Sequence, residues 1–73
     1  MVYEGNGGTY DEGKTQFVDD FVTSIKENMF TAAPAGKVFS GWNTAADGNG
    51  DSVAAGNTEF KHGVLYAIWA DES

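Results

Sequence analysis

The stretch "FSGWNTAADGNG", Phe39 to Gly50, joins a strand-forming segment to a turn. Val38, Phe39 and Trp42 favour a strand, and Gly41 within it indicates a bulge or the close approach of another backbone. The Asp, Asn and Gly residues that follow are typical of a turn. The sequence therefore predicts an irregular strand that ends in a polar turn.

Three other segments favour strands. "VLYAIW", Val64 to Trp69, is apolar at both alternating positions, as expected for a strand buried in the middle of a sheet. "MVYE" predicts a strand at about Val2 to Gly5, and "SVAAGNTEF" predicts a weak edge strand. The tryptophans of the two main strands would then close a small core with Phe39 and Tyr66.

The composition describes one small domain that folds without disulfides. The chain has 73 residues, ten aromatic residues and no cysteine. A chain of this length buries only about 60% of its unfolded surface, so its aromatic side chains must supply much of the core. The absence of cysteine also excludes a thiolate metal site.

The charge excludes nucleic acid as a partner. Four basic residues stand against eleven acidic ones, for a net charge of −7, and no basic cluster is present. The longest apolar stretch, "VLYAIWA", Val64 to Ala70, is far shorter than the roughly 20 residues of a membrane-spanning helix. We therefore expect a soluble chain with no membrane insertion. A signal peptide and an anchor would lie outside this fragment.

Three motifs together resemble a known family. They are "NGG" at Asn6 to Gly8, "FSGWNTAADGNG" at Phe39 to Gly50 and "LYAIW" at Leu65 to Trp69. Their order and separation are similar to the Listeria-Bacteroides repeat, also called the internalin B-repeat. The match covers nearly all of residues 1–73, as one module. The residues that carry the two longer motifs are Phe39, Gly41, Trp42, Leu65, Tyr66 and Trp69.

The resemblance implies an α+β fold: a β-grasp-like, small, curved, mixed sheet with one short helix packed against it. It also implies an extracellular location on the bacterial cell surface, in tandem arrays that act as spacers or adhesion units. Partners would be the neighbouring repeats or domains of the parent protein, and a host or cell-surface protein or glycan. The family carries no known catalytic residues, and we expect no cofactor and no enzyme activity.

Residues 16–29 allow two interpretations. Their apolar positions follow one face of a helix, which favours one continuous helix: Phe17, Val18, Phe21, Val22, Ile25 and Met29. The alternative is a strand near Gln16 to Val18 and a helix near Thr23 to Met29, and we expect this second arrangement. Pro34 and Gly36 favour a turn after it.

"GGTYDEGKT" contains the pattern of a phosphate-binding P-loop at Gly8 to Thr15. A working P-loop lies between a buried parallel strand and a helix, and it needs a magnesium-binding carboxylate on another strand. This chain is too short to supply all of these parts. Asp11 and Glu12 would also repel a triphosphate. A nucleotide-binding domain is therefore a remote alternative to a glycine-rich connection.

Two further groups invite a site prediction. Asp47, Asn49 and Asp51 are spaced like the start of a calcium loop, but the sixth and twelfth positions, Ser52 and Thr58, are wrong for one. A polar turn explains them better, so they form only a weak calcium candidate. The single histidine, His62, has no second histidine or cysteine as a co-ligand, and we expect a solvated turn residue.

Overall fold

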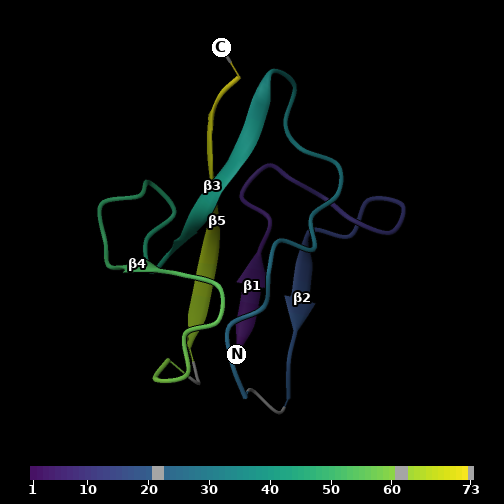
Figure 1. Ribbon diagram of the computed structural model, residues 1–73. Coiled ribbons are helices and arrows are strands. Elements are labelled where there is room, and N and C mark those ends of the chain that lie inside the picture. Colours follow the sequence, from purple (N-terminus) through teal and green to yellow (C-terminus); the bar gives the residue numbers. More distant parts are fainter. Residues whose placement is uncertain (21–22, 61–62, 73) are drawn as a thin grey trace.

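Five strands form one mixed sheet in the computed structural model, which describes residues 1–20, 23–60 and 63–72 (Figure 1). The order across the sheet is β2-β1-β5-β3-β4, with β1 and β5 parallel and all other neighbours antiparallel. The strands are β1 Val2–Glu4, β2 Gln16–Val18, β3 Lys37–Asn43, β4 Ser52–Val53 and β5 Val64–Asp71.

The central strand is β5, as its apolar sequence predicts. It pairs with β1 through Val64 to Tyr66 and with β3 through Tyr66 to Asp71. The predicted strands near the N-terminus and at Gln16 to Val18 are confirmed as β1 and β2. The weak edge strand is confirmed as the two-residue β4.

A bulge in β3 puts two aromatic residues on the same face of the sheet. Residues three apart in a regular strand point to opposite faces, but the register of β3 shifts between Phe39 and Gly41. The rings of Phe39 and Trp42 consequently lie 5.1 Å apart, centroid to centroid. Gly41 has a φ of 156°, and a Cβ there would meet nothing within 4 Å, so the backbone angle and not crowding favours glycine.

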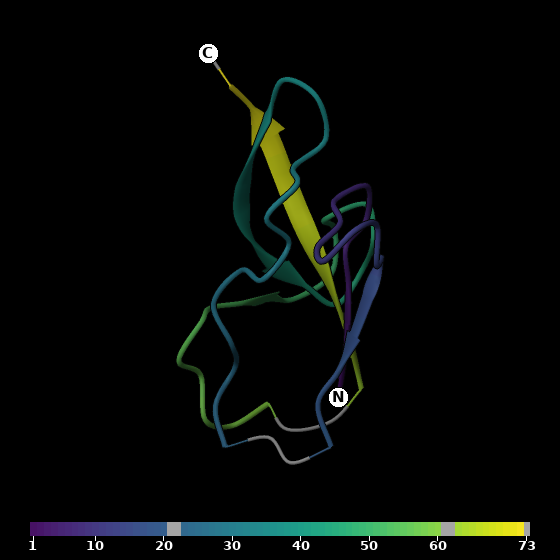
Figure 2. The same ribbon diagram turned by 90° about the vertical axis from the view of Figure 1, so that its right-hand side faces the viewer.

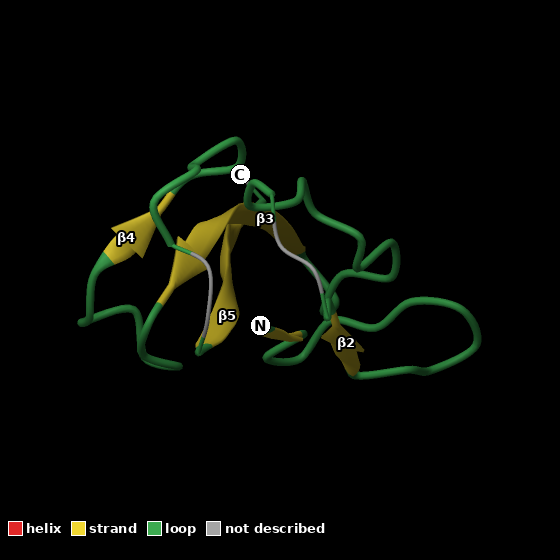
Figure 3. Ribbon diagram, turned by 90° about the horizontal axis from the view of Figure 1, so that it is seen from below, coloured by secondary structure: helices red, strands yellow, loops and turns green. Residues whose placement is uncertain are grey.

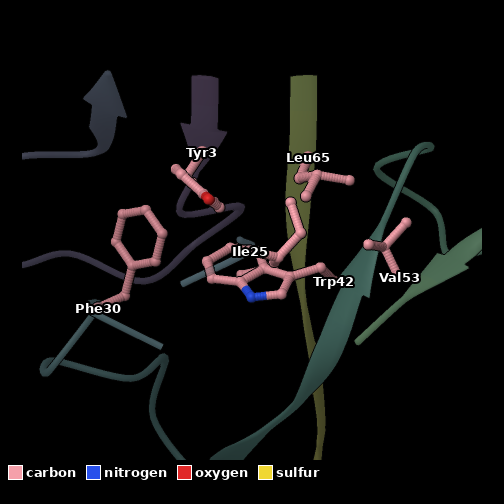
Figure 4. Close-up of a cluster of buried hydrophobic side chains, with 7 residues drawn as sticks. Tyr3, Ile25, Phe30, Trp42, Val53 and Leu65 are labelled. Carbon is pink, nitrogen blue, oxygen red and sulfur yellow. The ribbon is translucent and has the colours of Figure 1, made fainter. Parts of the chain in front are cut away.

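The core lies between this face of the sheet and two irregular segments. Side chains from the strands meet side chains from residues 23–36, and Figure 4 shows them gathered around the Trp42 ring. In Figure 2 residues 23–33 and the loop that follows β4 lie on the same side of the sheet. The buried apolar residues are Tyr3, Ile25, Phe30, Trp42, Val53, Leu65 and Ala67.

The predicted helix near Thr23 to Met29 is wrong. Among the described residues the chain forms strands and loops but no helix (Figure 3). The backbone at Ile25 is instead tied to the loop after β4: its N–H donates to Asn57 and its carbonyl accepts from Gly56. The Lys26 N–H donates to the Tyr3 hydroxyl, so these groups cannot form the i to i−4 bonds of a helix.

The fold class needs the same correction. An α+β fold with a β-grasp-like sheet and a packed helix does not fit a chain whose described residues form a five-stranded mixed sheet without a helix. The continuous helix over residues 16–29 also fails, because its first turn is β2. Phe21 and Val22, which belong to that interpretation, lie outside the described residues.

Candidate ligand-binding groove

The family-like motif residues build the aromatic core. Phe39 packs edge-on between Trp42 and Trp69, with ring centroids 5.1 and 5.7 Å away. Leu65 is fully buried on the same face, whereas Tyr66 is half-buried on the opposite one. Edge-to-face aromatic pairs add about 0.5–1.5 kcal/mol each beyond the area they bury. Phe39, Trp42, Leu65 and Trp69 therefore have structural roles in the core, whereas the prediction that Tyr66 belongs to this core is wrong, because it lies on the other face of the sheet.

Both indole N–H groups hold a loop against the sheet. Trp42 Nε1 donates to the carbonyl of Lys26 at 2.9 Å, and Trp69 Nε1 donates to the carbonyl of Gly5 at 2.8 Å. The Trp69 ring also lies on Gly8, where a Cβ would come within 2.2 Å of it. Glycine is therefore required at position 8, because the Trp69 ring leaves no room for a Cβ there.

Asn6 ends the parallel pairing of β1 with β5, a role that its place in the sequence did not predict. Its side-chain Nδ2 donates to the carbonyl of Ala67 at 2.9 Å and to that of Ala46 at 2.8 Å. Its φ of 50° turns the chain away from the sheet. One amide thus joins β5 to the turn after β3, and the "NGG" motif at Asn6 to Gly8 was the signal that could have pointed to it.

The segment from Gly8 to Thr15 forms a tight hairpin. Tyr10 and Lys14 exchange backbone hydrogen bonds of 2.9 and 2.8 Å around a three-residue turn. The Lys14 ammonium pairs with Asp11 at 3.0 Å, which together with the charge of Asp11 raises the pKa of Lys14. The next element is β2, a strand. The backbone N–H groups of Gly8, Thr9, Tyr10 and Lys14 are thus already bonded within the protein and do not point to a shared phosphate.

The weak calcium candidate is a polar turn in this structure. Both carboxylate oxygens of Asp47 accept hydrogen bonds from Asn49, at 3.0 and 3.2 Å. The bond from the Asn49 backbone contributes most to a lowered pKa of Asp47. Asp51 accepts from and donates to Thr44 through its backbone carbonyl and N–H. Within residues 1–20, 23–60 and 63–72, no three acidic or histidine side chains gather as a metal site would require. His62 lies outside those residues.

An open groove lies at the end of β1, beside the exposed edge of β5. Its volume of about 340 Å³ is within the usual range for ligand sites. Ile68 and Trp69 are consecutive in β5 and point to opposite faces, so a groove that both residues line runs along the strand's edge. The lining residues are Asn6, Gly7, Pro34, Lys37, Ala46, Asp47, Ile68 and Trp69.

The groove combines apolar walls with a charged rim. Ile68, Trp69 and Pro34 supply apolar surface. Lys37 forms an ion pair with Asp71, and the hydrogen bond and charge of Lys37 lower the pKa of Asp71. The lining includes Trp69 and Asp47, which the sequence singled out individually, and Asn6, Gly7, Ala46 and Ile68, which belong to the three motif stretches. An apolar groove with a few polar groups is suited to binding, and the lining residues show no nucleophile paired with a base.

No helix in the described part of the chain is long and apolar enough to cross a membrane. No protein-family model and no solved structure matches the chain.

Two curated proteins of Evansella cellulosilytica are similar to it. One, named "Putative Gly-rich membrane protein", is 34% identical over 71 residues, which cover 88% of this chain. The other, named "Putative membrane protein", is 33% identical over 78 residues, which cover 97% of it. The chain spans only 8% and 11% of the lengths of these two proteins. Their names are consistent with a cell-envelope location.

Proposed function

We propose that this chain is a non-catalytic repeat module of a bacterial cell-surface protein, of the Listeria-Bacteroides repeat type, and that it acts as a spacer and/or an adhesion unit. The motif resemblance supports the proposal, since Phe39, Trp42, Leu65 and Trp69 pack together on the core face of the sheet and Gly41 lies at the bulge of β3. The two similar proteins support it as well, because each is roughly ten times longer than the matching segment. The same proteins bear membrane-protein names, which is consistent with a cell-envelope location. An extracellular position on the cell surface is part of the proposal.

The observation that carries the spacer role is the position of the two chain ends. β1 runs parallel to the start of β5, with Val2 opposite Val64, so the chain enters at one end of the sheet. It leaves after Asp71, about 23 Å further along the strand at about 3.3 Å per residue. Figures 1 and 2 show the N- and C-termini far apart along the same direction. Copies joined in this way would extend an array.

Small-angle scattering of one, two and three directly linked copies tests the spacer role. A spacer predicts that the maximum dimension grows by a constant increment per copy and that the scattering fits a rod. A matched chain with a flexible glycine-serine linker between copies gives the curve of freely jointed beads. If the direct fusion gives that same curve, the spacer role is wrong.

The groove beside β5 favours the adhesion role, in which the module has its own host ligand, a protein or a glycan. A single copy can bind too weakly to detect, so linked copies should be screened against protein and glycan arrays. Binding that is weakened by Ile68→Ser would support adhesion through the groove. An array that stays silent with three linked copies would contradict it.

The nucleotide-binding alternative has a direct test. We expect Mg²⁺-ATP to leave the amide NMR signals of Gly8 to Thr15 unchanged, because the Tyr10 and Lys14 backbone groups bond to each other. Shifts confined to this segment would contradict a non-nucleotide module.

A further inference from the structure

Part of the edge of β5 has no neighbouring strand among residues 1–20, 23–60 and 63–72. β5 extends over eight residues, but β1 pairs only with Val64 to Tyr66. Beyond that point the Asn6 side chain bonds to the carbonyl of Ala67. The stretch of β5 from Ile68 to Asp71 therefore has β3 on one side and an open edge on the other.

The hydrogen-bond pattern shows which backbone groups face that edge. Opposed residues in an antiparallel ladder alternate between pairs that exchange hydrogen bonds and pairs that do not. The Glu72 N–H donates to Gly36, so the next bonded pair is Val38 with Ala70. The N–H and C=O groups of Trp69 and Asp71 consequently point away from β3, toward the open edge.

The groove described above lies along this same edge. Ile68 and Trp69 line it from the two faces of β5, and Asn6 and Gly7 close it where β1 ends. A strand placed there would meet the outward backbone groups of Trp69 and Asp71. Its alternating side chains would point to the two faces of the sheet and contact the apolar surface of Ile68 on one face and of Trp69 on the other.

The acidic residues around the open edge of β5 indicate which kind of segment can bind there. Asp47, Asp71 and Glu72 lie on or beside this stretch, and Lys37, which is paired with Asp71, is the one basic residue among the described residues that line the groove. The whole chain carries a net charge of −7, so a second copy would be repelled. A segment with Lys or Arg would be attracted.

We propose that the open edge of β5 at Trp69 and Asp71, together with the groove beside it, binds an extended basic peptide segment by strand addition. Backbone hydrogen bonds to Trp69 and Asp71 would supply affinity, and the groove would select an apolar side chain between basic ones. The inference rests on the adhesion part of the proposed function and names its ligand class. It does not involve the spacer part.

The first test uses a nine-residue peptide in which lysine and valine alternate, titrated into the isotope-labelled chain at roughly 0.15 M salt. Strand addition predicts that the amides of Trp69 and Asp71 shift and that their hydrogen exchange slows at least about tenfold at saturation. The control peptide has the same sequence with N-methyl groups on alternate backbone amides, which keeps the charge and removes the donors. Equal binding of the two peptides, or shifts only at other acidic residues such as Asp11 and Glu12, would overturn the proposal.

The second test separates backbone pairing from charge. Asp71→Pro removes an N–H that faces the open edge and is not part of the β3 ladder, a position where proline is tolerated. Asp71→Ala is the matched variant, because it loses the same ion pair with Lys37 and keeps the N–H. We expect the alternating peptide to bind the proline variant about fivefold more weakly than the alanine variant.

Equal affinity of the two variants would overturn the proposal. The N-methylated peptide on the unchanged protein decides the question independently if the proline variant fails to fold. Scattering of linked copies needs no peptide, so a rod-like array without peptide binding would contradict this inference alone. Binding of glycans with no response to the peptide would also overturn it.

Discussion

Each tryptophan fixes a loop that carries little regular structure of its own. Trp42 holds residues 23–36 through the carbonyl of Lys26, and Trp69 holds the first glycine-rich loop through the carbonyl of Gly5. Buried indole N–H groups need such partners, since an unpaired one costs about 1–3 kcal/mol. Side chains far apart in the sequence thereby position both walls of the core.

Gly8 is needed because the Trp69 ring leaves no room for a Cβ. In Gly8→Ala the new atom would lie 2.2 Å from that ring, so we expect a loss of about 1–3 kcal/mol in the free energy of unfolding. Gly13→Ala is the control: its Cβ would meet nothing within 4 Å, and only the φ of +103° opposes it, at about 1 kcal/mol. Urea denaturation compares the two. A Gly13 variant that is as damaged as the Gly8 variant would contradict the crowding at Trp69.

The ion pair at the end of the groove predicts a pH effect. Lys37→Met removes the hydrogen bond and charge that lower the pKa of Asp71, so we expect that pKa to rise toward its ordinary range in a carboxyl NMR titration. A lowered folded-state pKa gives stability that is present above the unfolded value of about 3.9 and is lost as the pH falls through the folded value. The variant should therefore lose less stability on acidification. Lys14→Met should leave the Asp71 titration unchanged, and a shift there would contradict the assignment.

At the scale of the elements, the strands can be predicted from local sequence. The conformation of residues 23–36, which pack against the sheet, cannot. β3, β5 and the bulge at Gly41 are visible in short stretches of apolar residues and glycine. The helical spacing at residues 23–29 is equally visible, yet these residues form no helix. Their N–H and C=O groups form hydrogen bonds with side chains of β1 and β3 and with the backbone of the loop after β4. The Asn28 side chain accepts a hydrogen bond from the Phe30 N–H. A helix of seven residues has too little intrinsic stability to compete.

Because residues 23–29 form no helix, we expect substitutions at Ile25 and Met29 to change stability by different amounts. A helix would place both residues on the same face and make their effects similar. Ile25 is 2% exposed in the core, whereas Met29 only packs against its edge. We expect Ile25→Ala to cost about 2–4 kcal/mol of unfolding free energy and Met29→Ala roughly half as much. Urea denaturation measures both values. Equal costs, together with a helical far-UV circular dichroism signal, would contradict this arrangement.

At the scale of the whole molecule, a small aromatic core supports a strongly acidic surface. The net charge of −7 opposes the compact state through self-repulsion, while it keeps copies in an array apart. The termini lie at opposite ends of the sheet, which suits a linear array (Figure 1). The groove at the edge of β5 remains at the side of such an array.

Self-repulsion predicts that salt stabilises the folded chain at neutral pH. Raising sodium chloride to about 0.5 M should raise the melting temperature at pH 7, because it screens repulsion between the acidic groups. Near the isoelectric point of about 4.2 the same salt step should have much less effect, since the net charge is close to zero. A salt effect of equal size at both pH values would contradict the electrostatic explanation.

The sequence by itself determined the strands, the bulge and the grouping of Phe39, Trp42 and Trp69, because apolar alternation and an isolated glycine act over a few residues. It also singled out Trp69 and Asp47, although for reasons other than the groove that they line. Only the tertiary structure decided that residues 23–29 are irregular and that the edge of β5 is open. Both features depend on hydrogen-bond partners distant in sequence, such as Asn57 for Ile25 and Ala67 for Asn6, and no local pattern encodes those pairings.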